Sequence, residues 1–88
     1  MLENFKEYLI NDARNKLGKK LKESTINDYL YRVVRICREE DISLELLANN
    51  IDSYVELYGP YGKKSYFGKG SHRSYISSLK HFQKYIHK

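Results

Sequence analysis

Apolar residues in this chain recur every three or four positions, in several separate stretches. In the last stretch, Tyr75, Leu79, Phe82 and Ile86 follow one another at intervals of four, three and four residues. This spacing places the four side chains on one face of an α-helix, whereas a half-buried strand requires strict alternation. No stretch of the chain shows convincing alternation, so the pattern predicts an all-α fold.

The length and composition are those of one small folded domain. The chain has 88 residues, of which 41% are hydrophobic and 31% charged, enough for a single core. No apolar run exceeds three residues, so neither a transmembrane span nor a signal-peptide core is predicted. We therefore expect residues 1–88 to form one bundle of four to five helices that does not associate with a membrane.

Cap and breaker residues divide the chain into helical segments. Ser, Thr and Asn favour helix starts, and Gly favours helix ends. We expect helices over residues 2–17, 25–40 and 71–86, with short helical turns after Ser43 and over 51–58. The apolar stripe of the first helix includes Leu17. The expected caps and breaks are Gly18, Ser24, Ser43, Asn49, Asn50, Gly59, Pro60 and Ser71.

Charge is unevenly distributed along the chain. The net charge is +5, but all eleven acidic residues precede Gly59, whereas seven of the sixteen Lys and Arg residues follow it. The second part begins with a glycine-rich loop over 59–70, in which we expect Tyr61, Tyr66 and Phe67 to be exposed. A basic loop that leads into a basic amphipathic helix is typical of proteins that bind a polyanion.

Basic and hydroxylated residues lie on helix faces opposite to the predicted apolar stripes. On the last helix these are Arg73, Ser77, Lys80 and Lys84, and on the second helix Thr25, Arg32 and Arg35. The two arginines lie about one turn apart and could reach one groove of a nucleic acid, or could pair with Asp28 and Glu39 instead. In the loop, Lys63, Lys64 and Lys69 are candidate contacts to backbone phosphates.

Two further charged regions could each take part in binding. The basic residues around the predicted end of the first helix could form a second phosphate-contacting edge or a solvated helix terminus. Residues 39–56 contain six acidic residues and no Lys or Arg, so this side should face away from a nucleic acid and could bind a protein. The basic cluster comprises Arg14, Lys16, Lys19, Lys20 and Lys22.

The sequence carries no set of residues that indicates catalysis, a metal or a cofactor. The Gly-Lys pairs do not fit a phosphate-binding loop, because Gly62 and Gly68 are separated by five residues where four are needed. The three histidines lack the spacing of a metal site. The single cysteine, Cys37, cannot form an internal disulfide and falls at a helix-core position, so we expect a buried thiol in a reducing cytoplasm.

Several local patterns together resemble a known family. They are Phe5-x-x-Tyr8-Leu9, Ser24-Thr25-Ile26-x-x-Tyr29-x-x-x-Val33, Asn50-Ile51-x-x-Tyr54-Val55 and Ser71-x-x-x-Tyr75-Ile76-Ser77-Ser78-Leu79-Lys80-x-Phe82-x-x-Tyr85-Ile86. In this order the chain resembles the SAM-like core-binding domain that precedes the catalytic domain of tyrosine recombinases, the phage integrases. His72, Ser78 and the long 59–70 loop depart from the family pattern.

The resemblance implies a helical bundle that grips one face of double-stranded DNA, with its second and fourth helices toward the major groove. By position it assigns DNA contacts to Thr25, Arg32 and Arg35, and to Arg73, Ser77, Lys80 and Lys84. It also implies a C-terminal catalytic domain in the same full-length chain, which would supply the tyrosine nucleophile, and it leaves protomer contacts on DNA open. The alternative function is a helical protein-interaction module that uses the acidic surface over 39–56.

Overall fold

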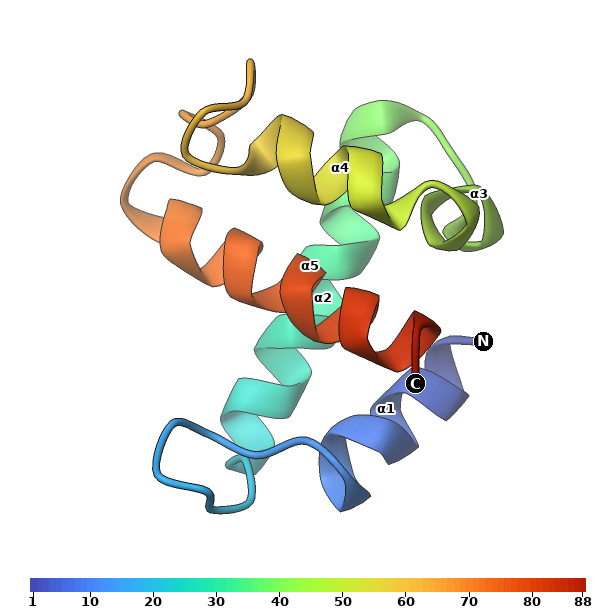
Figure 1. Cartoon of the computed structure of the whole chain (residues 1–88), viewed down its shortest axis with the longest axis vertical. Coiled ribbons are helices and arrows are strands. Elements are labelled where there is room, and N and C mark those ends of the chain that lie inside the picture. Colours follow the sequence, from blue (N-terminus) through green and yellow to red (C-terminus); the bar gives the residue numbers. More distant parts are fainter.

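The computed structural model describes all 88 residues and contains five α-helices and no β-strand. This confirms the all-α prediction. A single 3-10 turn, η1, precedes the last helix (Figure 1). The elements are α1 (Leu2–Asn11), α2 (Glu23–Glu40), α3 (Leu44–Asn49), α4 (Ile51–Tyr58), η1 (Lys69–Ser71) and α5 (His72–Ile86). No helix is both long enough and apolar enough to cross a membrane.

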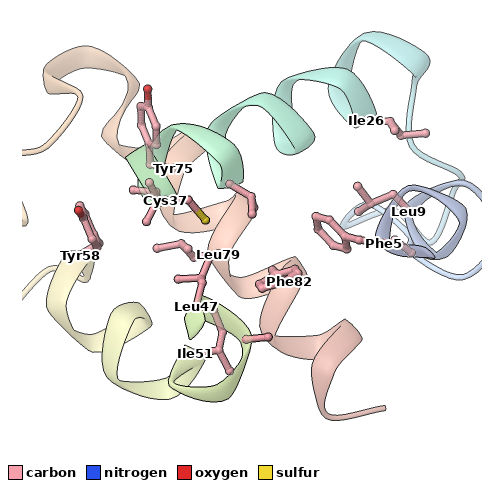
Figure 2. Close-up of a cluster of buried hydrophobic side chains, with 14 residues drawn as sticks. Phe5, Leu9, Ile26, Cys37, Leu47, Ile51, Tyr58, Tyr75, Leu79 and Phe82 are labelled. Carbon is pink, nitrogen blue, oxygen red and sulfur yellow. The ribbon is translucent and has the colours of Figure 1, made fainter. Parts of the chain in front are cut away.

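Helix α5 lies at the centre of the bundle, where it crosses α2 and runs beside α4 (Figure 1). The predicted stripe is largely confirmed, because Tyr75, Leu79 and Phe82 are buried and Ile86 packs partly buried against the core. Side chains from every α-helix meet these residues (Figure 2). Removing each large apolar side chain from water stabilises the fold by roughly 1.5–3 kcal/mol, so α5 holds the other helices together.

Helix α1 ends earlier than its apolar pattern predicts. Its last residue is Asn11, and residues 12–22 form a loop in which Leu17 is 79% exposed. The side-chain oxygen of Asn15 accepts hydrogen bonds from the amides of Leu17 and Lys19, which replaces helical bonding with a local turn. Gly18 is left-handed as expected (φ 76°), but it lies inside this turn and not at a helix end. The prediction of a helix to Leu17 was therefore wrong.

The predicted helix starts have mixed outcomes. Ser43 caps α3 as expected, since its Oγ accepts a hydrogen bond from the Leu46 amide at 3.1 Å. Ser24 is wrong as a cap, because α2 begins one residue before it and Lys22 occupies the cap position without a side-chain bond. Ser71 occupies the cap position of α5 but makes no capping bond either, because the 3-10 turn η1 leads directly into this helix.

The glycine-rich loop is folded onto the bundle. Phe67 packs edge-to-face against Tyr58 and Tyr75, with ring centroids 5.3 and 4.9 Å away, so its predicted exposure was wrong. Tyr61 and Tyr66 are exposed as expected. The Cys37 thiol is buried as predicted, and burial raises its pKa.

Candidate nucleic-acid interface

Three of the predicted contact residues line one cavity of about 500 Å³. Thr25 comes from the first turn of α2, and Ser77 and Lys84 come from α5. The loop between α1 and α2 supplies five further lining residues. We call this the basic cavity, and its lining residues are Arg14, Asn15, Lys16, Leu21, Lys22, Thr25, Tyr29, Ser77, His81 and Lys84.

The basic cavity contains four cationic side chains and no carboxylate. None of the four cations, Arg14, Lys16, Lys22 and Lys84, forms an ion pair, because the basic side chains that contact acids are Lys64, His87 and Lys88. Arg14 is held in place by hydrogen bonds from Nη1 to the carbonyl oxygens of Asn11 and Ala13, at 3.0 and 2.8 Å. The cavity is therefore a region of uncompensated positive charge that attracts anions.

An aromatic pair joins the two helices beside this cavity. The rings of Tyr29 and His81 stack with centroids 4.9 Å apart and an interplanar angle of 29°. Burial and, as a smaller cause, the positive charge of Lys84 lower the pKa of His81, which favours the neutral form of the ring. Its Nδ1 is buried and has no hydrogen-bond partner.

Helical spacing explains how the cavity residues come together. Ser77, His81 and Lys84 lie at i, i+4 and i+7 on α5, and Thr25 and Tyr29 lie at i and i+4 on α2, so each set shares one face. His81 and Tyr29 were not among the predicted site residues. The spacing of Ser77 and Lys84 could have identified His81, and that of Thr25 could have identified Tyr29.

The remaining predicted residues of α5 face solvent. Arg73 and Lys80 are exposed, and neither forms an ion pair. Together with Ser77 and Lys84 they extend the positive surface from the basic cavity along α5. These residues therefore remain candidates for phosphate contacts.

The two predicted arginines of α2 stack on aromatic rings. The guanidinium of Arg32 lies 5.2 Å from the centre of the Tyr75 ring, and that of Arg35 lies 6.0 Å from the centre of the Phe67 ring. Neither pairs with a carboxylate, which removes the alternative of salt bridges to Asp28 and Glu39. Arg35 is exposed, whereas Arg32 is half-buried and its Nε lacks a partner. Arg35 is thus the better placed of the two to meet a ligand.

The loop lysines separate into two kinds. Lys63 and Lys69 are exposed and unpaired, so both stay in the candidate set. Lys64 pairs with Glu40 at 2.5 Å and approaches Glu39 at 3.9 Å. Because these carboxylates already neutralise its ammonium group, we remove Lys64 from the candidate contacts.

The acidic segment and the basic cavity lie at opposite ends of α2. Helices α3 and α4 sit near its C-terminal end, and the loop over 12–22 lies at its N-terminal end (Figure 1). Helices α3 and α4 are therefore separated from the basic cavity, whereas the basic loop over 59–70 contacts the acidic segment through the bond from Lys64 to Glu40. No group of three or more His, Cys, Asp or Glu side chains is placed to hold a metal ion.

Comparisons with family models, with curated proteins and with solved structures found no match to this chain.

Proposed function

We propose that this chain is a DNA-binding module that contacts double-stranded DNA through the basic cavity and the exposed face of α5. The observation that carries the proposal is the convergence of four unpaired cations and no carboxylate in one cavity. Lysine and arginine side chains in such a position displace condensed counterions from DNA phosphates, which favours association. Arg73, Ser77 and Lys80 would continue the contact along α5.

We further propose that the module is the SAM-like core-binding domain of a tyrosine recombinase. The sequence patterns shared with that family and the packing of the last helix against the second support this assignment. The structure divides the middle segment into α3 and α4, so α5 takes the place of the family's fourth helix. In this proposal a separate catalytic domain of the full-length protein breaks and rejoins DNA, and the present chain positions the duplex.

A titration of the 15N-labelled chain with short duplex DNA tests the proposal. We expect amide shifts in 14–35 and 63–84 that weaken as salt rises. If about five charges meet phosphates, the logarithm of the affinity should fall with the logarithm of salt concentration with a slope of roughly −4 to −5. Lys80→Ala and Lys84→Ala should each weaken binding, whereas Lys6→Ala removes an exposed charge from α1 and should not.

Two outcomes would overturn the proposal. Equal losses from Lys84→Ala and Lys6→Ala would indicate that binding follows total charge and not the basic cavity. Absence of any response to DNA, with shifts in 39–58 on addition of a protein ligand, would favour the interaction-module function.

A further inference from the structure

The basic cavity has an arrangement of charges suited to one anionic group, and not only to negative charge spread along a polymer. Its cations come from three directions: Arg14 and Lys16 from the loop, Lys22 from the start of α2, and Lys84 from α5. A flat basic surface presents charges side by side, but here three elements contribute charges to one open hollow of about 500 Å³. Charges that converge in this way favour a group with charge on several oxygen atoms, and the volume leaves room for the parts of a larger ligand that flank this group.

Neutral hydrogen-bond donors accompany these cations. The hydroxyl groups of Thr25, Tyr29 and Ser77 line the cavity, and none of them donates to a side-chain or backbone acceptor in the protein. Each hydroxyl can therefore donate a hydrogen bond to a ligand oxygen. The guanidinium of Arg14 uses only Nη1 for its backbone bonds, so its other donors also remain available.

The start of α2 adds a further positive contribution. Lys22 occupies the cap position without capping the helix, so the first-turn amides of this 18-residue helix lack a side-chain acceptor. Lys22 and Thr25 both line the cavity, which places this helix end beside the other three cations. Free amides and the helix dipole favour an anion at such a position.

We propose that the basic cavity binds a single phosphate group of a DNA strand, either an internal phosphodiester or a terminal phosphate monoester. The inference rests on the proposed function, because DNA supplies the phosphate. It goes further in assigning one phosphate to a defined receptor made by the loop, α2 and α5. The rest of the basic face would then make ordinary, interchangeable phosphate contacts.

Inorganic phosphate is the direct probe. The 15N-labelled chain is titrated with phosphate at constant ionic strength, with chloride as the replaced anion. We expect saturable shifts confined to the cavity residues, together with a change in the ring signals of His81. Lys84→Gln should weaken phosphate binding about fivefold or more, whereas Lys80→Gln, one turn away and outside the cavity, should change it less than about twofold.

Duplexes with and without a 5′-phosphate distinguish the two sources. Tighter binding of the phosphorylated duplex, abolished by Lys84→Gln, indicates a terminal phosphate. Equal binding of both duplexes, with cavity shifts that Lys84→Gln removes, indicates an internal phosphodiester.

The failures of the inference and of the proposed function are separable. If duplex binds but inorganic phosphate acts no differently from chloride, and Lys80→Gln and Lys84→Gln weaken duplex binding equally, the single-phosphate receptor is wrong and DNA binding stands. If phosphate saturates the cavity but no duplex binds, the DNA-binding function is wrong. Amide spectra of both variants, compared with that of the unmodified chain, verify that each remains folded.

Discussion

Lys64 in the glycine-rich loop donates a hydrogen bond to Glu40 near the end of α2, with 2.5 Å between Nζ and Oε2. Tyr58 donates to the same oxygen, so one carboxylate joins the loop, α2 and α4. Burial alone would raise the pKa of Glu40, but the bonds from Lys64 and Tyr58 lower it below its ordinary value. The loop that sequence reasoning assigned to phosphate binding is thus partly fixed by an internal ion pair.

Replacing this carboxylate should loosen the loop. We expect Glu40→Gln to reduce the free energy of unfolding by about 1 kcal/mol, because the charged hydrogen bond is lost but Lys64 is partly exposed. Urea denaturation measures the effect. Glu45→Gln, at an exposed position without a hydrogen bond, is the matched control and should change the stability by less than about 0.5 kcal/mol. Equal effects of the two substitutions would contradict the role of the Glu40 bonds.

Two glycines in the same loop should respond differently to alanine. Gly68 has φ +80°, and a Cβ there would lie 2.7 Å from the ring of buried Tyr75. Gly68→Ala should therefore cost at least about 1–2 kcal/mol of stability. Gly70 has open space around it and an ordinary φ, so Gly70→Ala should change stability by about 0.5 kcal/mol or less. Thermal unfolding of both variants checks this, and a Gly68→Ala variant as stable as Gly70→Ala would show that the loop is not packed as described.

The pH dependence of stability should carry a contribution from His81. Its pKa is lowered in the folded protein, so the unfolded chain takes up a proton first as the pH falls through the ordinary histidine value of about 6.5. Stability should therefore decrease from pH 7 toward pH 5. His81→Gln should flatten this part of the curve, whereas His87→Gln, at an exposed site beside Asp52, should leave it in place. Melting temperatures of both variants, measured across this pH range, provide the test. An unchanged pH dependence in His81→Gln would show that His81 is not the source of this contribution.

Leu9 and Leu17 share the predicted stripe of the first helix but differ in the structure. Leu9 is fully buried, so Leu9→Ala should cost about 2–5 kcal/mol. Leu17 is mostly exposed in the loop, so Leu17→Ala should change stability by less than about 0.5 kcal/mol. Denaturant unfolding of both variants provides the measurement. A large loss in Leu17→Ala would mean that α1 extends to Leu17, as its periodicity predicted.

The spacing of apolar residues correctly predicted helices where the residues at that spacing are buried in the structure. The stripe of α5 was recognisable because Tyr75, Leu79 and Phe82 face the core over several turns. Periodicity failed at Leu17, where the side chain of Asn15 bonds the amides that a longer helix would use. An apolar spacing cannot reveal such competition from a polar neighbour.

The candidate site was only partly predictable for a different reason. Lys64 meets Glu40 across 24 residues of sequence, and Phe67 is partly covered by rings from α4 and α5, so neither outcome follows from local pattern. The basic cavity likewise depends on how the 12–22 loop folds toward α5. Its α5 residues could be found from helical spacing, but their proximity to Arg14 and Lys16 required the tertiary structure.

In the loop between α1 and α2, the exposed residues that can contact a ligand are separate from the residues that anchor the loop to the core. Ala13 is buried and Leu21 packs against the core, whereas every residue from 14 to 20 is exposed. A backbone bridge between Arg14 and Lys20 closes this segment on itself. The segment can therefore be exchanged for one of different length or charge while both of its anchors stay in place. Anion preference could diversify at this position, by evolution or by grafting, without any change to the interior that determines stability.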